Sequence, residues 1–402
     1  MNRRLISLTA LAALAFAACR DGSETTAPGA SPDASNARPP QNPTGGVYVQ
    51  TNSAAGNEVV AYRRAANGTL SRVGTFSTGG LGTGEGVSSQ GSVLLSDDGR
   101  WLLVANVGSD EVSVFAVRPS GLALTDKVGS GGDMPFSLAL RGSLLYVLNR
   151  GGAGNITAFT LSPTGELSPL ANSTRPLSGS VTGSPTLPDP AQVSFSPDGA
   201  TLVVTEKATN LLDTYAVNPT TGLATGPNVF SSSGQLPFGF AFKPSTSIFV
   251  VTEAFGGELG QAAASSYTIG NGSALRLISG SVGNTQAEVC WTVITNDGRY
   301  AYVTNFRTGN LSSYAVAADG GLTLLQAIAG TTTPPGADPR FGPRDEDLSR
   351  DGRYLYVLDI GLTDPADRGV HAFRVEPDGK LTKLGASPLP GSFPAVAGLA
   401  AD

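Results

Sequence analysis

One pattern recurs along most of this chain and limits what it can fold into. Each copy has an apolar run, a tight turn containing Asp-Gly, a run of β-branched and aromatic residues, a polar turn and an alternating run. Clear copies are SVLLSDDGRWLLVANVGSDEVSVFAV (92–117), QVSFSPDGATLVVTEKATNLLDTYAV (192–217) and WTVITNDGRYAYVTNFRTGNLSSYAV (291–316). Asp-Gly between alternating runs is a strong β-hairpin signal. The pattern predicts an array of antiparallel β-units.

Two sets of equivalent residues count the units. The second strand of each unit ends near a polar residue: Asn52, Asn106, Asn149, Glu206, Glu253, Asn305 and Asp359. The third strand carries an aromatic residue: Tyr62, Phe115, Phe159, Tyr215, Tyr267, Tyr314 and Phe373. A fourth strand follows, as in GLALTDKV and GKLTKLG. Seven four-stranded units of about 50 residues are typical of a propeller. We predict an all-β fold, one seven-bladed β-propeller with four antiparallel strands per blade, over residues 47–402.

The two ends of the repeated region predict how the ring closes. The first unit begins at VYVQTN (47–52), which is already second-strand sequence, so this unit lacks an inner strand. The C-terminal segment FPAVAGLAAD (393–402) is comparable with the inner-strand sequences MPFSLALRG and LPFGFAFKP. The C-terminal strand is therefore expected to complete the first blade.

The N-terminal residues are read as a targeting segment. Arg3 and Arg4 precede the apolar run LISLTALAALAFAA, which predicts a signal peptide over residues 1–18. Ala17-Ala18-Cys19 resembles the lipobox of bacterial lipoproteins, which implies lipid on Cys19 and attachment to the membrane; an ordinary secretory peptide is the alternative. Residues 20–46 contain no Val, Ile, Leu, Met or aromatic residue, so 19–46 is expected to be a lipidated, disordered tether. We expect a bacterial cell-envelope location, periplasmic or surface-facing.

Charge and rare residues exclude several kinds of chemistry. The net charge is −6 and no Lys/Arg run exists, so a nucleic-acid partner is not expected. The chain has two cysteines and one histidine; with Cys19 lipidated, Cys290 has no disulfide partner, and His371 falls on a strand face away from it. We interpret Cys290 as a small buried residue. No metal spacing or nucleotide fingerprint is present, so neither a metal nor a cofactor is expected, and the protein is expected to be a monomer.

Loop lengths indicate which end of the propeller carries function. The connections from the first to the second strand and from the third to the fourth are tight, whereas the remaining connections are longer and lie together on the opposite face. The ends of the second strands and the starts of the inner strands open onto that face. The ligand-binding candidates there are Asp189, Gln192, Glu206, Trp291 and Asp345. Charged surface residues are more often merely solvated, and that alternative stays open.

The repeat units also resemble a known family. DGRYAYVTN, the following YAV and especially YAVNPTTGLAT are similar to the lactonase propellers, which include 6-phosphogluconolactonase and carboxymuconate cyclase, and to the YVTN-repeat surface propellers. The resemblance covers essentially 47–402 and implies a propeller that hydrolyses a lactone.

The functional residues of the lactonase family are only partly present. Its histidine positions fall on Asp189 and Ala191, on Gly239 and on Val293, so the histidines are absent. Glu253 matches a glutamate of the family and Arg344 an arginine, while Glu206 stands where the family has Asp. The resemblance thus implies Glu253 or Asp189 as general base and Arg344 as oxyanion stabiliser.

Two functions remain open from the sequence. The first is a lipid-anchored, extracytoplasmic propeller that hydrolyses a lactone or related ester of carbohydrate type. The second is a non-catalytic propeller that binds a ligand, glycan or protein partner on its long-loop face.

Overall fold

The computed structural model describes residues 45–183, 186–333, 342–361, 368–391 and 395–402, all within one compact unit, Gln41–Asp402. The predicted signal peptide, the predicted lipidation site Cys19 and nearly all of the predicted tether lie outside these residues. Within them, no helix has the length and apolar character needed to cross a bilayer.

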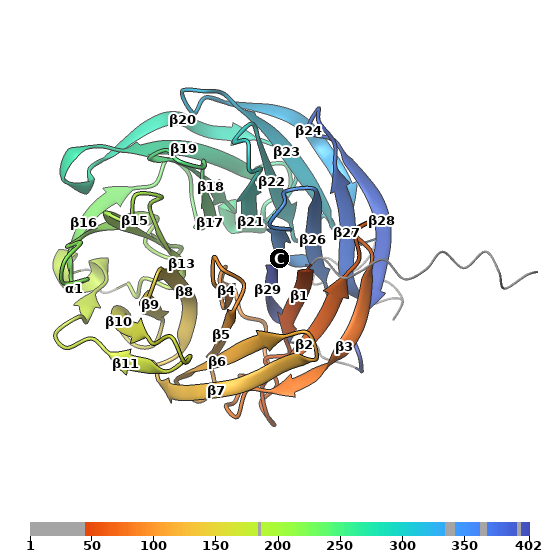
Figure 1. Cartoon of the computed structure of the whole chain (residues 1–402). Helices are drawn as coiled ribbons and strands as arrows, with labels where there is room; N and C mark the ends of the chain where they lie inside the picture. The colour runs from red at the N-terminus through yellow and green to blue at the C-terminus, as the bar shows by residue number, and fades with distance from the viewer. Residues whose placement is uncertain (1–44, 184–185, 334–341, 362–367, 392–394) are drawn as a thin grey trace, which may run out of the picture. The chain divides into compact units, whose positions relative to one another are not determined.

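The described chain forms seven sheets arranged in a ring, each running from an inner to an outer strand (Figure 1). From inner to outer, blades 1–4 are β29 (Ala397–Ala401), β1 (Gly45–Gln50), β2 (Glu58–Arg64), β3 (Leu70–Ser77); β4 (Val93–Leu95), β5 (Trp101–Asn106), β6 (Glu111–Arg118), β7 (Gly121–Gly129); β8 (Pro135–Arg141), β9 (Leu144–Asn149), β10 (Asn155–Leu161), β11 (Leu167–Pro169); and β13 (Pro190–Phe195), β14 (Thr201–Glu206), β15 (Leu211–Val217), β16 (Ala224–Ser231). Blades 5–7 are β17 (Pro237–Phe242), β18 (Ile248–Glu253), β19 (Ala263–Ile269), β20 (Leu275–Gly283); β21 (Val289–Ile294), β22 (Tyr300–Asn305), β23 (Asn310–Val316), β24 (Leu322–Thr331); and β25 (Pro343–Leu348), β26 (Tyr354–Asp359), β27 (Gly369–Val375), β28 (Leu381–Pro388).

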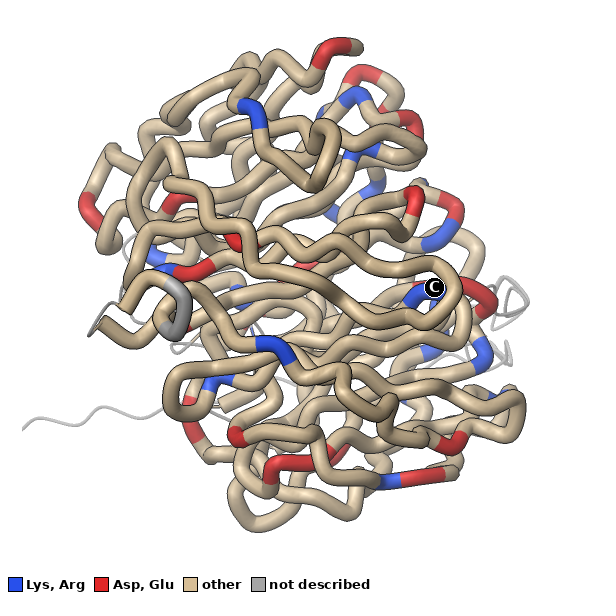
Figure 2. The backbone as a smooth tube through the Cα atoms, turned by 90° about the vertical axis from the view of Figure 1, so that its left-hand side faces the viewer, with Lys and Arg blue, Asp and Glu red and all other residues tan. Residues whose placement is uncertain are grey.

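The predicted seven-bladed, four-stranded architecture is confirmed. In blade 3 the outer strand is short, and β12 (Arg175–Pro176) pairs with β10 beside it. The few helical turns lie in connections: α1 (Ser178–Thr182), η2 (Phe255–Gly257) and η3 (Asn271–Ser273). Charged residues gather mostly at the turns and strand ends, as the side view shows (Figure 2).

Neighbouring blades are joined by a contact that repeats around the ring. The first residue of the second strand packs on the glycine in the turn between the third and fourth strands of the next blade. A Cβ on Gly165 would lie 2.2 Å from the ring of Trp101, and one on Gly379 would lie 2.5 Å from the ring of Tyr300. Tyr302 adds a hydrogen bond from its hydroxyl to the carbonyl of Gly379, at 3.0 Å. The turn glycine therefore leaves the space into which the preceding blade packs.

The C-terminal strand closes the ring, as the sequence predicts. β29 pairs with β1 in antiparallel register, with Val47 opposite Ala401. Blade 7 holds the other side of β29 by an unusual device, because the backbone N–H groups of Leu399 and Ala401 donate to the carboxylates of Asp345 (2.9 Å) and Asp347 (2.8 Å). Asp345, one of the predicted ligand-binding residues, thus serves ring closure.

Three consecutive acidic residues at this junction make closure sensitive to pH. Burial raises the pKa of Asp347 to about 7, and it raises the pKa of Asp345 and Glu346 well above the usual range. Glu346 is 2% exposed, and within the described residues neither of its carboxyl oxygens has a hydrogen-bond partner. Raised carboxyl pKa values stabilise the fold most below the unfolded pKa of about 4, and this stabilisation is lost as pH rises through the folded pKa.

We predict that Glu346→Gln will stabilise the protein at pH 8 by about 1 kcal/mol or more, because one unit of raised pKa is worth about 1.4 kcal/mol. The gain should shrink at pH 4, where the wild-type carboxyl is protonated in both states. Chemical denaturation at both pH values measures this, with Glu376→Gln, a partly exposed residue paired with Arg374, as the control. Equal effects of Glu346→Gln at the two pH values would contradict the assignment.

Candidate functional site

A pocket of about 450 Å³ opens at the long-loop end of the central channel. This volume lies within the range of small-molecule sites. Its charged lining residues are Glu85, Arg150, Asp189, Lys207 and Glu288, and its apolar walls include Phe136 and Phe238. The sequence prediction that the long-loop face carries the ligand-binding features is consistent with this position.

Four lining residues come from equivalent positions of blades 3–6. Each is the last residue before an inner strand, and each has a left-handed φ: Met134 (57°), Asp189 (45°), Leu236 (52°) and Glu288 (55°). Non-glycine residues in this region carry strain of roughly 1 kcal/mol or more. In each case the carbonyl accepts a bond from the residue that follows the second strand: Arg150, Lys207, Ala254 and Phe306. In each of these blades, the end of the loop before the inner strand is thereby fixed to the end of the second strand at the pocket.

The strongest charge cluster of the pocket surrounds Asp189. Oδ1 of Asp189 accepts a hydrogen bond from Nε of Arg150 at 2.6 Å and lies 3.6 Å from Nζ of Lys207. Oδ2 has no hydrogen-bond partner among the described residues. Two cations therefore hold one oxygen of this carboxylate and leave the other for a ligand or a water molecule.

A second charged group faces the same pocket from blades 6 and 7. Burial raises the pKa of Glu288, while Arg307 and Arg344 oppose that rise. A Cβ on Gly86, a pocket residue, would lie 2.6 Å from Nη1 of Arg344, which places this guanidinium at the pocket edge. Nη1 is buried and has no hydrogen-bond partner among the residues that the structure describes. Arg344 thus offers an unsatisfied donor, and Glu288 offers a carboxyl whose raised pKa favours protonation. Both features suit the binding of a polar ligand.

The floor of the pocket is a segment that crosses the channel. Residues 86–91, here called the channel plug, precede β4 and reach toward the middle of the ring (Figure 1). Plug residues 86–88 line the upper pocket, whereas Gln90 and Gly91 line a separate cavity of about 280 Å³ nearer the opposite end. Gln90 is bonded to Thr292 of blade 6, through Nε2 to the carbonyl at 2.8 Å. The plug thus separates the two cavities.

The sequence-predicted site residues are dispersed by the fold. Asp189 lines the pocket and Arg344 lies at its edge. Trp291 is 4% exposed, stacks edge-to-face on Phe238 at 5.0 Å and donates its indole N–H to Ser89 of the plug at 2.7 Å. Its role is to hold the floor. Gln192 bonds the backbone of Phe240 and lines the lower cavity.

Glu206 and Glu253 are fully buried and do not line the pocket. The carboxylate of Glu206 accepts bonds from Thr209 and from the backbone and hydroxyl of Ser178. Glu253 accepts bonds from Gly234 N at 2.8 Å, Ser265 at 2.5 Å and Ser281 at 2.7 Å. Each carboxylate binds the connection that precedes its own blade, through Ser178 or Gly234, and a later segment of the same blade, which is a structural position.

Arg150, Lys207 and Glu288 are pocket residues that the sequence reasoning missed. A usable signal existed for two of them, because Arg150 and Lys207 each come directly after a member of the second-strand series, Asn149 and Glu206. The residue one place beyond that series points to the channel mouth. Glu288 gives no comparable signal, since its position depends on a left-handed backbone.

Cys290 is buried, as expected, but it lines the pocket. Burial raises the pKa of its thiol well above the ordinary value, which disfavours the reactive thiolate. Its Sγ contacts the carbonyl of Glu288 at 3.4 Å. His371 is buried on β27 of blade 7, whereas Cys290 is on β21 of blade 6, so the described part of the chain provides no Cys–His pair.

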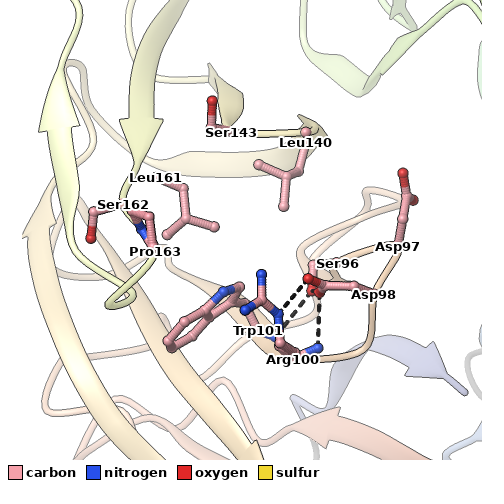
Figure 3. Close-up of a pocket in the computed structure, with 11 residues that line it drawn as sticks. Ser96, Asp97, Asp98, Arg100, Trp101, Leu140, Ser143, Leu161, Ser162 and Pro163 are labelled. Atoms are coloured by element: carbon pink, nitrogen blue, oxygen red, sulfur yellow. Dashed lines mark hydrogen bonds and ion pairs between the residues drawn. The ribbon is translucent and has the colours of Figure 1, made fainter.

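Another hollow lies between blades 2 and 3, at the tight-turn end (Figure 3). Trp101 forms one wall, and Asp98 and Arg100 pair with each other beside it (Figure 3). The ring of Trp101 packs on Gly165 of the next blade, which is the same blade-to-blade contact that Tyr300 makes with Gly379. We therefore assign this groove to the repeat rather than to a ligand.

Comparison with known proteins agrees with this architecture. The family described as lactonase, 7-bladed beta-propeller matches residues 48–182 and 246–386. The chain belongs to this lactonase family. No curated protein matches the sequence.

Solved structures resemble this lactonase-family propeller over most of their length. A putative 6-phosphogluconolactonase from Bacteroides fragilis is 18% identical with a TM-score of 0.67, and the periplasmic gluconolactonase of Pseudomonas aeruginosa is 19% identical with a TM-score of 0.65. A protein from Lactobacillus plantarum is 18% identical with a TM-score of 0.69. Each match covers 89% of this chain and 98% of the other. At this identity the likeness shows the fold alone.

The buried position of Glu253 leads to a stability prediction. Glu253→Gln replaces an acceptor oxygen by an NH₂ group that must face hydrogen-bond donors, and we expect a loss of about 1–3 kcal/mol. Thermal and urea unfolding measure it, with Glu258→Gln, an exposed residue of the same blade, as control. Unchanged stability combined with lost activity would instead place Glu253 in the reacting site.

Proposed function

We propose that the protein hydrolyses a lactone or a related ester of carbohydrate type in the upper pocket. The observation that carries the proposal is the Asp189 carboxylate, with Oδ1 held by Arg150 and Lys207 and Oδ2 without a partner. A carboxylate fixed by one oxygen can accept a proton through the other, which is what a general base for water requires. Membership of the lactonase family supports a lactone as the substrate.

The charges of the pocket suit each step of lactone hydrolysis. Asp189 takes a proton from water, and the hydroxide formed attacks the lactone carbonyl carbon. The guanidinium of Arg150, with terminal nitrogens not used on Asp189, stabilises the oxyanion. The ring C–O bond then breaks, and the leaving oxygen takes a proton from Glu288, whose burial favours the protonated form. The product is a hydroxy acid, and Phe136 and Phe238 offer apolar walls for the C–H faces of a sugar ring.

The sequence analysis named Glu253 and Asp189 as candidates for the general base, and this proposal selects Asp189. Asp189 lines the pocket, whereas Glu253 is saturated by internal donors. Arg344 lies at the pocket edge, where its unsatisfied Nη1 is suited to bind a substrate oxygen.

The proposed setting is the bacterial cell envelope, with lipid on Cys19 and residues 20–46 as a tether. The support is the lipobox-like Ala17-Ala18-Cys19 and the lack of large apolar residues in the tether. The similar Pseudomonas aeruginosa protein is a periplasmic gluconolactonase, which is compatible with such a location. A non-catalytic ligand-binding propeller remains the alternative, because residues other than histidine stand at the histidine positions of the family.

We predict that the purified protein releases protons from aldonolactones and that Asp189→Asn lowers kcat/KM by about a hundredfold or more, the usual contribution of a general base. Asp378→Asn, on an exposed turn and paired with Lys380, is the matched control and should be silent. A pH-stat assay with several sugar lactones measures both. Saturable lactone binding without proton release would favour the binding propeller, and full activity of Asp189→Asn would remove Asp189 from the mechanism.

A further inference from the structure

Lys207 occupies an enclosed position between the pocket and the plug. Its side chain is 6% exposed, and Nζ lies 5.5 and 5.1 Å from the ring centres of Phe136 and Phe238. Nζ donates to the carbonyls of Ser88 at 2.8 Å and Pro190 at 3.2 Å, and the third neighbour is Oδ1 of Asp189 at 3.6 Å. An ammonium group has three hydrogens, and two of them are used on these carbonyls, while Asp189 at 3.6 Å is an ion-pair contact. Most of the donor capacity of Lys207 is therefore used within the protein, on two backbone carbonyls.

The plug is held at three successive carbonyls by side chains of three blades. Lys207 of blade 4 binds the carbonyl of Ser88, Trp291 of blade 6 binds that of Ser89, and Ser137 of blade 3 binds that of Gln90. Lys207 is the one charged donor of the three, and it also contacts Asp189. Hydrogen bonds from charged donors are about twice as strong as neutral ones. The plug and the carboxylate of the pocket therefore share one ionic anchor.

We propose that Lys207 is a positioning residue that keeps the channel plug closed beneath the pocket and fixes the orientation of Asp189. The first half concerns the plug alone, whereas the second rests on the proposed lactone hydrolysis. When the anchor is lost, the plug moves, the pocket loses its floor toward the lower cavity, and Asp189 is restrained by Arg150 alone.

The surroundings of Lys207 make this anchor sensitive to alkaline pH. Burial lowers the pKa of Lys207 to about 8; Asp189 and Cys290 oppose this effect and Arg150 adds to it. Above pH 8 the neutral amine binds the plug carbonyl and Asp189 more weakly. An arginine at this position keeps its charge at that pH.

Cys290 provides a reporter of plug closure that is independent of catalysis. Its thiol is 5% exposed, lines the pocket and belongs to the apolar cluster that contains Trp291. The charge of Lys207 lowers the pKa of the thiol, so removing that charge slows alkylation when the structure is unchanged. Opening of the plug does the opposite and speeds alkylation. The two effects differ in sign.

The test compares iodoacetamide labelling of Cys290, resolved by peptide mass spectrometry, in the native full-length protein. At pH 7 we expect Lys207→Met to label about tenfold faster than wild type, the effect of losing one charge-assisted bond. Trp291→Phe, which removes the donor to Ser89 while leaving Lys207 intact, should also label faster. The matched control is Lys243→Met, because Lys243 likewise bridges two carbonyls, of Gly298 and Ala317, away from the pocket. Equal or slower labelling of folded Lys207→Met would overturn the role in the plug.

Lys207→Arg keeps the test decisive even when Lys207→Met does not fold. We expect this variant to match wild type in labelling at pH 7 and to label more slowly than wild type at pH 9, where wild-type Lys207 is largely neutral. In the lactone assay, we expect the kcat of wild type to fall near pH 8 as Lys207 loses its charge, and we expect this fall to move to higher pH in Lys207→Arg. If the ratio of the Lys207→Arg labelling rate to the wild-type rate is the same at pH 7 and pH 9, the plug role is refuted. If this ratio changes between the two pH values while the pH profile of kcat is the same in both proteins, only the effect on Asp189 is refuted.

Discussion

The pairing of β29 with β1 is the constraint on which the rest of the structure depends, because it turns a row of blades into a closed ring. Only a closed ring has a channel mouth at which loops from several blades meet. The protein secures this strand from its other side with carboxylates of Asp345 and Asp347, which accept backbone N–H groups as a neighbouring strand would. Burying acidic groups here costs stability at neutral pH. Their role as acceptors for the backbone of β29 explains why an acidic run stands in an inner strand.

The pocket arises from positions that the repeat makes equivalent and the sequence makes different. Four loop-end residues adopt left-handed backbone conformations at the mouth, yet they are Met134, Asp189, Leu236 and Glu288. The same scaffold therefore places two carboxyls and two apolar groups around one cavity, and the following strand ends add Arg150 and Lys207. The backbone is the same at these positions in each of the four blades, and the different side chains there give the pocket its charges.

The sequence predicted the fold well because the hairpin turns and the third-strand aromatic residues recur about every 50 residues. The closing strand was predictable for the same reason, since one unit lacked a strand and the C-terminus supplied it. The site was harder. Glu253 resembles a functional glutamate of the family, but its hydrogen bonds with Ser265 and Ser281 depend on the irregular register between β19 and β20, which no local pattern indicates. The channel plug and the contact of Lys207 with Ser88 join residues 119 positions apart, which the spacing of the repeat does not encode.

The most direct measurement is a crystal structure of the protein soaked with an aldonate, the hydroxy-acid product of the proposed reaction. The account predicts one bound molecule in the upper pocket above a closed plug, with its carboxylate near Arg150 and the free oxygen of Asp189 within hydrogen-bond distance. Density confined to the groove beside Trp101 or to the lower cavity, with the upper pocket empty at saturating ligand, would contradict it.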